Sequence, residues 1–393
     1  MADTHNIVIL GASYGGIGVA NGISKAITSL KSQTEKTYKI TLIANSTHFW
    51  YSVGAPRAML KPYPKSNDDS FFPISKFVEQ QPAGQVEFIH AEITDLDTSS
   101  REVYYKTKDA NEDISATASS LHFDTLVIAL GSKGASPLYS LQGSHVTTLK
   151  AYEDIQSRLP SAKSVIVVGG GSAGVETAGE LGDLHGSNSS SPKDITIFSG
   201  SSRLLTGLRP AIGTRAEEML NAQGVKAVHD DLKLQSSKRL PDGREEAVFS
   251  DGSTRTVDIL IVATGRSPAS SFLPKSLLDA SGKVKTDDFT RIPGVDSAYA
   301  LGDIASISPG GLVAMMTMVG TTYGNVIAEL SGKGKGKGWK PLTTKEMQLV
   351  PVGPNGGVGA AFGWWLPSFA VKMIKSKTFM FDRAEKWALG QAT

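Results

Sequence analysis

The stretch VIVVGGGSAG, at residues 165–174, joins a short β-branched strand to the spacing G-x-G-x-x-G. In this arrangement Gly169 permits a tight turn, Gly171 lets the backbone approach a pyrophosphate, and Gly174 lets the next helix pack closely on the strand. The amino terminus of that helix then stabilises the phosphate charge. The stretch therefore predicts a dinucleotide-binding strand, turn and helix, with a turn that binds no ligand as the alternative.

A weaker copy of the same pattern, GASYGG, occupies residues 11–16. Gly11 opens it, but Ser13 stands where the second glycine belongs. A serine fits there if its Cβ points away from the phosphate, and Gly15 with Gly16 preserves the close helix packing. We predict a second dinucleotide site here. The alternative is a structural turn that has lost its ligand.

The chain therefore repeats a strand, a Gly-rich turn and a helix, which predicts an α/β fold with two Rossmann-like dinucleotide-binding domains. Two further apolar strands are expected to end at Gly131 and at Gly265, as buried parallel strands do. Besides the two strands that precede the glycine turns, we expect strands at residues 38–43, 125–130, 194–198 and 259–263.

The length of 393 residues favours two domains and a smaller element. We expect the first domain at residues 1–148 and 285–330, with the second, residues 149–284, inserted between its halves. The small C-terminal α+β segment would be residues 331–393.

The composition excludes several kinds of chemistry. The chain has no cysteine, so it lacks a redox-active dithiol and thiolate metal ligands, and its seven scattered histidines show no metal-ligand spacing. Any electron transfer by this chain would therefore need a bound cofactor. A net charge of +2 gives no reason to expect a nucleic-acid partner. Without a signal peptide or a long apolar run, we expect a cytoplasmic protein, at most peripheral to a membrane. Nothing in the sequence specifies an oligomeric state.

Both predicted sites lack the acidic residue that usually binds the adenosine ribose at the end of the second strand. The first strand ends at Asn45 and Ser46, which would have to take that role. The second ends at Ser199, and Arg203 follows it. Since no carboxylate repels a 2′-phosphate there, NADPH is as plausible as NADH, with Arg203 or serine hydroxyls as partners. Arg203 could equally be a solvated surface charge.

Three segments resemble the AIF-like, ferroptosis-suppressor type of NAD(P)H:quinone oxidoreductase. They are KAYED at residues 150–154, VVGGGSAGVETAGE at residues 167–180 and YALGD at residues 299–303. Such proteins are flavoproteins with two dinucleotide-binding domains on the glutathione-reductase plan, related to type II NADH dehydrogenases. The resemblance implies FAD and NAD(P)H as cofactors, with hydride passing from NAD(P)H to the flavin and on to a quinone-like acceptor.

The resemblance also implies roles for single residues. Asp303 would bind the flavin ribityl chain, or else cap a helix. Glu176 would lie beside the nicotinamide and the flavin, or else be a helix-surface acid. Arg57 would lie near the flavin, and Lys375 near its isoalloxazine ring, unless its helix is merely basic and interfacial. Further cofactor-binding candidates are Ile93, Gly131 and Gly265.

The end of the chain offers a second kind of surface. Residues 331–340, SGKGKGKGWK, predict a flexible tether that cannot pack a core. Beyond it, Trp364, Trp365 and Phe379 with nearby lysines suit a weak, peripheral membrane contact, or simply cover the flavin domain. Two other functions stay open: a flavin-dependent tailoring oxidoreductase, and an AIF-like signalling or nucleic-acid-binding protein, which only the lysines of the tether support.

Overall fold

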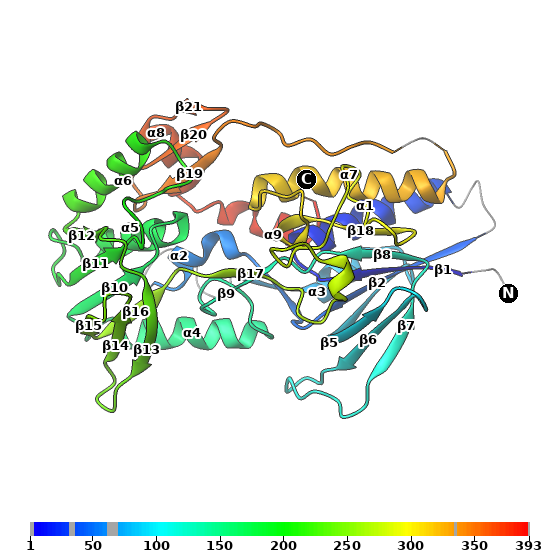
Figure 1. Ribbon diagram of the computed structural model, residues 1–393, viewed down its shortest axis with the longest axis horizontal. Helices are drawn as coiled ribbons and strands as arrows, with labels where there is room; N and C mark the ends of the chain where they lie inside the picture. The colour runs from blue at the N-terminus through cyan, green and yellow to red at the C-terminus, as the bar shows by residue number, and fades with distance from the viewer. Residues whose placement is uncertain (1–3, 31–35, 61–69, 334–335, 392–393) are drawn as a thin grey trace.

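The computed structural model describes residues 4–30, 36–60, 70–333 and 336–391. Two parallel sheets form the centres of two units that lie toward opposite ends of the molecule's long axis (Figure 1). This mixed α/β architecture confirms the predicted pair of Rossmann-like domains. We keep the boundaries 1–148 with 285–330, 149–284 and 331–393 as a proposal.

The first sheet has seven strands in the order β18-β8-β1-β2-β5-β6-β7. The first five are parallel, and the last two pair antiparallel. Residues 7–10 are fully buried, because a parallel strand covered on both faces is apolar along its length. The strands are β18 (Ala298–Ala300), β8 (Thr125–Ile128), β1 (Thr4–Leu10), β2 (Thr37–Ala44), β5 (Val86–Asp97), β6 (Glu102–Thr107) and β7 (Ser119–His122).

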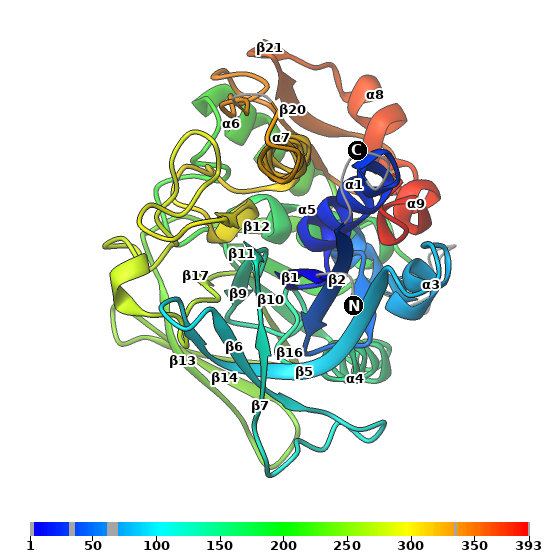
Figure 2. The same cartoon turned by 90° about the vertical axis from the view of Figure 1, so that its right-hand side faces the viewer.

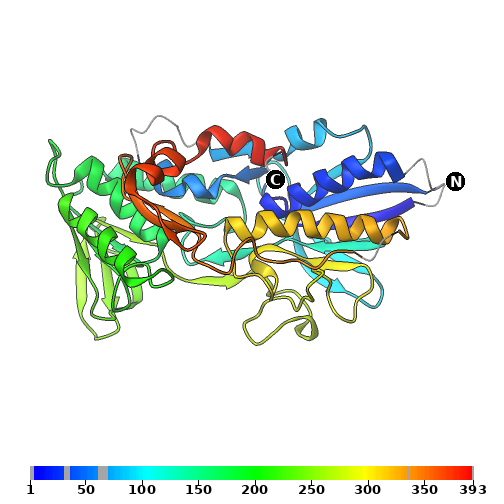
Figure 3. The same cartoon turned by 90° about the horizontal axis from the view of Figure 1, so that it is seen from above.

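Two long helices, α1 (Tyr14–Leu30) and α7 (Leu312–Leu330), run side by side against this sheet (Figures 2 and 3). Their close approach requires a glycine, since a Cβ added at Gly22 would lie 2.5 Å from the ring of Tyr323. The contact joins the start of the chain to residues some 300 positions later. The YALGD segment also lies beside the first glycine turn, since a Cβ on Gly15 would lie 3.5 Å from Leu301.

The second sheet has four parallel strands in the order β12-β11-β10-β16. An antiparallel sheet, β13-β14-β15, packs against it through the rings of Phe198 and Phe249, whose centroids are 4.5 Å apart. The elements are β10 (Ser164–Val168), β11 (Asp194–Phe198), β12 (Val225–Val228), β13 (Leu234–Arg239), β14 (Glu245–Phe249), β15 (Thr254–Val257), β16 (Ile259–Val262), α4 (His145–Arg158), α5 (Ser172–His185) and α6 (Pro210–Ala222).

The two units are joined by short elements, and the C-terminal segment packs against the second. Strand β20 contacts α6, and β19 contacts α5 (Figure 1). The remaining elements are β3 (His48–Trp50), α2 (Ala55–Ala58), β4 (Phe71–Pro73), α3 (Ile74–Glu79), β9 (Ser132–Gly134), β17 (Arg266–Pro268), β19 (Gln348–Pro351), β20 (Gly357–Ala361), β21 (Trp364–Trp365), α8 (Ser368–Val371), a π-helical turn (Lys372–Ser376) and α9 (Ala384–Ala388).

The strand predictions are confirmed to within two residues at each end, and residues 194–198 agree in full. The prediction that residues 331–340 cannot pack is wrong for the part that the structure describes. Trp339 is buried, and its indole Nε1 donates to Thr317 Oγ1 at 3.0 Å. The Asn325 amide meanwhile donates to the carbonyl of Lys337 at 3.0 Å. One large apolar side chain and one amide partner are thus enough to attach this segment to α7. Residues 334–335 lie outside the described ranges.

The expected apolar surface at the chain's end is also only partly present. Trp364 and Phe369 are exposed, but Phe379 is fully buried, with the Arg57 guanidinium 4.6 Å from its ring centroid. In the described ranges, no helix combines the length and the apolar character needed to cross a bilayer.

Candidate functional site

The two glycine turns have the same backbone geometry. Gly11 and Gly169 both have positive φ, at 103° and 125°, and a Cβ on either would clash with a backbone carbonyl of the neighbouring parallel strand. A Cβ on Gly16 would collide with the carbonyl oxygen of Gly11, and a Cβ on Gly174 with that of Gly169. Both turns therefore need glycine where strand and helix meet, as phosphate-binding turns do.

The turns differ at the middle position. A Cβ on Gly171 would meet no atom within 4 Å, so the protein leaves open space where a pyrophosphate would approach. At the corresponding place in the first turn stands Ser13, which is partly exposed. Gly15 has room for a Cβ at 3.5 Å from Leu301, so the close packing in that turn depends on Gly16 rather than on Gly15.

In the second unit, Ser199 follows β11 and lies against the glycine turn. The Gly170 amide donates to the Ser199 carbonyl at 3.1 Å. The Ser199 hydroxyl donates to the Ser201 carbonyl at 2.6 Å and lies 3.1 Å from Nδ1 of His229. The other ring nitrogen of His229 lies 3.0 Å from Oε2 of Glu217 on α6. Two side chains from other elements therefore converge on the end of β11.

The Arg203 guanidinium faces its own loop. Its two terminal nitrogens donate to the backbone carbonyls of residues 204, 205, 206 and 208, at 2.7 to 3.2 Å. To bind a 2′-phosphate, the side chain would have to give up these bonds. The arrangement explains why an arginine is present here without assigning it to a ligand.

In the first unit, Asn45 follows β2, and its carbonyl accepts from Lys108 Nζ at 3.3 Å. The same ammonium donates to Oε2 of Glu112 at 3.0 Å. Although partial burial acts to raise it, hydrogen bonds from Ser144 and Lys108 hold the pKa of Glu112 below its ordinary value. An ionised carboxylate from the hairpin between β6 and β7 thus lies at the strand end that lacks an acid of its own. Nothing in the sequence pointed to Glu112.

Ser46 is not a free ribose partner. Its hydroxyl donates to the His48 carbonyl at 3.0 Å and accepts from the His145 amide at 3.3 Å. The rings of His48 and His145 lie 3.9 Å apart between centroids, with their planes tilted by 33°. Burial, with His48 beside it, lowers the pKa of His145 to about 4, so His145 is neutral near pH 7. Ser46 and the histidines therefore shape the wall of the site.

The two predicted catalytic residues lie together. Lys375 Nζ donates to Oε1 of Glu176 at 2.6 Å and to the carbonyl of Leu349 at 3.3 Å. Glu176 comes from the first turns of α5, just past the glycine turn, and only 6% of its side chain is exposed. It is therefore not a helix-surface acid. Lys375 comes from the π-helical turn, nearly 200 residues later.

A second buried ion pair lies one helical turn further along α5. The Arg57 guanidinium binds Glu180 through two bonds, of 2.8 and 2.7 Å, and donates to the carbonyls of Ser376 and Lys377. Both side chains are almost fully buried, at 2% and 0% exposure. Arg57 therefore joins α2, α5 and the turn that carries Lys375. Sequence reasoning missed Glu180, although its spacing of four residues from Glu176 puts both carboxylates on one helix face.

The electrostatics of this centre follow from burial. Burial raises the pKa of Glu176 above its ordinary value, the Lys375 ammonium acts in the opposite direction, and the Glu180 carboxylate reinforces the rise. Tyr139 lies alongside, with its hydroxyl 2.6 Å from Thr177 Oγ1, and burial raises its pKa as well. A carboxyl group with a raised pKa beside an ammonium is suited to holding or passing a proton.

Asp303 lies between the two halves of the first unit. It accepts from Ser132 Oγ at 3.0 Å, from Arg266 Nη1 at 3.2 Å, and from the amide of Gly311, just before α7, at 2.9 Å. The last contact is of the capping kind, and the carboxylate is still partly exposed, at 24%. Two candidates, Gly131 and Gly265, have positive φ and flank the β9–β17 pair.

The remaining candidate, Ile93, lies in β5 past the end of its pairing with β2 and packs against the core. It lies at the same end of the sheet as Asn45, because His90 of β5 pairs with Ala44 of β2. The structure therefore brings the candidates into four groups: one at the end of β2, one at the end of β11, one around Glu176 and Lys375, and one around Asp303 beside the β9–β17 pair.

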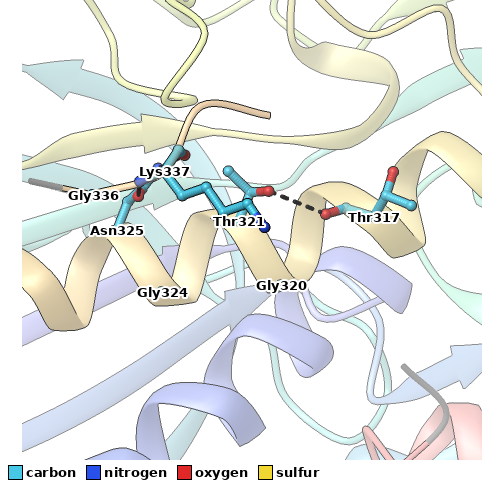
Figure 4. A pocket seen from close by; sticks show the side chains of 7 residues that line it. All are labelled: Thr317, Gly320, Thr321, Gly324, Asn325, Gly336 and Lys337. Atoms are coloured by element: carbon cyan, nitrogen blue, oxygen red, sulfur yellow. Dashed lines mark hydrogen bonds between the residues drawn. The ribbon is translucent and has the colours of Figure 1, made fainter. Parts of the chain in front are cut away.

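A groove of about 760 Å³ lies elsewhere, between α7 and the attached segment that contains Lys337 and Lys340. Figure 4 shows an adjoining pocket of about 390 Å³, whose wall includes Thr317, Gly320 and Gly324 of α7. The groove is remote in sequence from both glycine turns and contains none of the predicted site residues. It adds nothing to the redox chemistry.

Comparison with known proteins gives a consistent result. A sequence model of the pyridine nucleotide-disulphide oxidoreductase family matches residues 5–325. An oxidoreductase from Penicillium herquei is 32% identical, over 98% of this chain and 97% of that protein. One from Pestalotiopsis fici is 30% identical, over 95% and 96%.

More distant relatives extend the picture. Ferroptosis suppressor protein 1 of Xenopus tropicalis is 26% identical, over 97% of this chain and 95% of its own. Among solved structures, the sulfide:quinone oxidoreductase from Aquifex aeolicus has a TM-score of 0.72 at 14% identity, over 99% of this chain and 92% of that one. The latter likeness concerns the fold.

Proposed function

The chain belongs to the pyridine nucleotide-disulphide oxidoreductase family, and from this premise we propose that it transfers hydride from NAD(P)H, through bound FAD, to a quinone-like acceptor. It is an oxidoreductase with FAD and NAD(P)H as cofactors. The observation that carries the proposal is the 2.6 Å contact between Glu176 and Lys375. This contact joins α5, the helix that follows the second glycine turn, to the C-terminal segment at one buried site.

The residues of the first unit fit FAD. The turn from Gly11 to Gly16 would receive the pyrophosphate at the amino terminus of α1. Asn45 and Glu112 would bind the adenosine ribose, and Asp303 the ribityl chain, which its partly exposed carboxylate leaves room for. The flavin supplies the two-electron chemistry, and the chain's residues bind, orient and exclude water.

The residues of the second unit fit NAD(P)H, whose pyrophosphate would approach through the open space at Gly171. NAD(P)H gives up a hydride, and reduction of a quinone by two electrons also takes up one proton, so the products are NAD(P)⁺ and a quinol. The pair formed by Glu176 and Lys375 is placed to hold that proton. Arg57 holds Lys375 in place through the neighbouring carbonyls.

The absence of cysteine from all 393 residues supports a direct acceptor. Relays to a disulfide need a thiol pair in the enzyme, and this chain has none. Electrons therefore pass from the flavin to a compound that accepts them without a protein thiol. Quinones have that property.

The acceptor would enter beside the C-terminal segment. Trp364 is 77% exposed, and Phe369 and Met373 are each 71% exposed, on elements adjoining the turn of Lys375. Aromatic and apolar side chains beside Lys372 and Lys377 suit a weak peripheral contact with lipid. We propose that this surface presents a lipid-soluble acceptor to the flavin.

The test is to measure flavin reduction and flavin reoxidation separately. Purified protein should be yellow, NADH or NADPH should bleach it, and quinones should restore the colour. The double variant Trp364→Ser/Phe369→Ser should keep bound flavin and its reduction by NAD(P)H, yet lose activity with long-chain quinones in liposomes more than with short soluble ones. An equal loss for both quinones, or none, would refute the role of this surface.

A second candidate function keeps the flavin and replaces the quinone with a specialised small molecule. The relatives from Penicillium herquei and Pestalotiopsis fici, at 32% and 30% identity, are named as oxidoreductases with no acceptor specified, which keeps this candidate beside the quinone. A reduced flavin that no member of a quinone panel reoxidises faster than oxygen does would support this alternative.

A further inference from the structure

One face of α5 contacts the C-terminal segment over about two helical turns. Positions three and four apart in a helix are neighbours, which places on this face Glu176, Gly179, Glu180 and Asp183. Glu176 accepts from the Lys375 ammonium at 2.6 Å, and strand β19 packs against the same helix. The face therefore combines a charged contact near its start with a close backbone contact further along.

The backbone contact is at Gly179. A Cβ added there would lie 2.7 Å from the amide nitrogen of Gly353, 2.7 Å from the Cα of Val352 and 2.9 Å from the Val352 carbonyl carbon. These are backbone atoms, which cannot rotate away as the end of a flexible side chain would. Gly179 lies outside the G-x-G-x-x-G pattern, so the dinucleotide motif does not explain it. The turn at residues 352–353 explains it, because this turn lies directly on the helix.

Two hydrogen bonds hold this turn in place on the second unit. The Val352 amide donates to the Gly356 carbonyl at 3.0 Å, and the Val352 carbonyl accepts from Nε2 of Gln223, the residue after α6, at 3.3 Å. Gly353 has a positive φ of 73°, and a Cβ on it would lie 3.2 Å from the Gly179 carbonyl oxygen. Both α5 and α6 therefore contact the turn, and the contact leaves no room for an added atom.

The position of this turn determines the surroundings of Lys375. Leu349 lies in β19, three residues before Val352, and its carbonyl accepts from Lys375 Nζ at 3.3 Å. Strand β19 also contacts the π-helical turn that carries Lys375. The ammonium is thus held between an oxygen from α5 and an oxygen from β19. A shift of β19 away from α5 would separate these two acceptors.

The first unit holds the chain that follows Lys375. Arg57 donates to the carbonyls of Ser376 and Lys377, and the Asn21 amide donates to the Gly390 carbonyl at 2.7 Å. Lys375 therefore lies where the C-terminal segment passes from contacts with the second unit to contacts with the first. Because Arg57 fixes the residues after it, Lys375 cannot simply follow β19 if that strand is displaced.

We infer that Gly179 is a positioning residue, which leaves room for the backbone of residues 352–353 on α5 and thereby sets the Lys375 ammonium against Glu176. The inference rests on the proposed function, since it takes from it the role of this pair in holding a proton. Four charged or titratable groups face Glu176 or lie beside it: Lys375 from the π-helical turn, Glu180 from α5, Arg57 from α2, and Tyr139. Lys375 is bonded to a carbonyl of β19, so displacement of β19 acts on Glu176 through this ammonium.

The experiment follows reoxidation of the NADPH-reduced flavin by a soluble quinone across pH, in Gly179→Ala and in Lys375→Met. Loss of the ammonium lets burial raise the pKa of Glu176 further, so the basic limb of the profile should move to higher pH in both variants. The plateau rate should fall by about tenfold in both. Flavin content and NADP⁺ affinity should stay within about twofold of wild type. An unmoved basic limb in a folded, flavin-loaded Gly179→Ala protein would overturn the inference.

The double variant Gly179→Ala/Lys375→Met tests whether both changes act through the same group. Its basic limb should move no further than that of Lys375→Met alone, whereas additive shifts would mean that Gly179 acts elsewhere and would refute its positioning role. Amide hydrogen exchange at residues 349–353 adds a measurement that does not depend on turnover. Exchange should be faster in Gly179→Ala than in wild type, and unchanged exchange would mean that the turn has not moved.

A matched control and a milder variant complete the design. Gly320→Ala adds the same methyl group to α7, where a Cβ would meet no atom within 4 Å, and should change neither the pH profile nor the exchange. If Gly179→Ala does not fold, Gln223→Met decides, because it removes the donor to the Val352 carbonyl without adding an atom at Gly179. Its basic limb should move in the same direction by a smaller amount, and an unmoved limb would contradict the inference.

The failure of the inference and of the proposed function can be told apart. If the basic limb moves in Lys375→Met but not in Gly179→Ala, the positioning role of Gly179 fails and the proton-holding pair stands. If it does not move in Lys375→Met, the proposed role of the pair fails, and the inference fails with it.

Discussion

The unit built on β1, α1 and β2 and the unit built on β10, α5 and β11 have turns of the same backbone, yet their surroundings differ. In the first, the middle turn residue is Ser13 and the strand-end carboxylate comes from a hairpin, through Glu112. In the second, the middle residue is Gly171 and the strand end is reached by His229 from the next strand.

This difference separates two roles that the glycine pattern is often given: close packing of strand and helix, and recognition of the ligand. Gly16 and Gly174 determine whether strand and helix can meet, and that requirement is identical in both units. Under the proposed function, recognition of the ribose would instead depend on side chains from elements outside the motif. The motif therefore predicts the backbone of a site better than it predicts the ligand.

The strongest test of this separation is to add one methyl group to each turn. In Gly16→Ala the new Cβ would collide with the Gly11 carbonyl, and in Gly174→Ala with the Gly169 carbonyl, and neither backbone can yield cheaply. We expect Gly16→Ala to lose its flavin. Gly174→Ala should stay yellow but bind NAD(P)⁺ at least about a hundredfold more weakly, roughly 2.7 kcal/mol.

Visible absorbance of the purified variants reports the flavin, calorimetry reports the nucleotide, and circular dichroism checks that each chain is folded. Gly207→Ala serves as the control, because a Cβ there would meet no atom within 4 Å. Loss of flavin from Gly174→Ala, in a folded protein, would show that the two units are not independent.

The next test concerns the centre where the units meet. Because the Lys375 ammonium opposes the effect of burial on Glu176, Lys375→Met should raise the pKa of Glu176 further above its ordinary value. The basic limb of the pH profile for flavin reoxidation by a quinone, where a proton-holding Glu176 is lost as pH rises, should then move to higher pH. The rate on the plateau should fall by about tenfold, as for loss of one proton-transfer partner.

Stopped-flow reoxidation of the NADPH-reduced flavin by a soluble quinone, across pH, measures this shift. Lys372→Met is the matched control, since its ammonium lies 3.2 Å from Asn355 Oδ1 and not against Glu176. A slower rate with an unmoved profile would mean that Lys375 positions the site without affecting proton transfer.

Much of the fold could be read from the sequence, because buried parallel strands are apolar throughout and glycine turns have few substitutes. Glu176 and Lys375 were both predicted from the family resemblance. Glu180 and Glu112 were not, because an ion pair such as Arg57 with Glu180 spans 123 positions and has no local pattern. Arg203 misled for the same reason, since its carbonyl partners are visible only once the loop is folded.

A smaller effect is expected where the adenosine ribose of FAD would bind. Glu112→Gln keeps the shape of the side chain but removes the charge that Lys108 and the ribose hydroxyls would share. We expect FAD to bind about fivefold more weakly, in line with the difference between charged and neutral hydrogen bonds. Fluorescence titration of FAD into deflavinated protein measures it, with Asp113→Asn on the same hairpin as the control. Unchanged affinity would assign the ribose to Asn45 alone.

The smallest expected effect comes from exchanging the middle residues of the two turns. Gly171→Ser places a side chain where the protein itself offers no contact within 4 Å, so the fold should be unaffected and any loss must arise from the approaching nucleotide. We expect NAD(P)⁺ to bind about threefold more weakly, about 0.7 kcal/mol. Ser13→Gly should change FAD affinity by less than about threefold, because the serine Cβ already points away from the phosphate if the site binds FAD. Calorimetry and flavin titration on both variants, with thermal unfolding as the check on folding, decide whether Ser13 leaves the phosphate position open or obstructs it. If Ser13→Gly tightens FAD binding tenfold or more, the serine obstructs the phosphate, and the first turn is a weakened dinucleotide site.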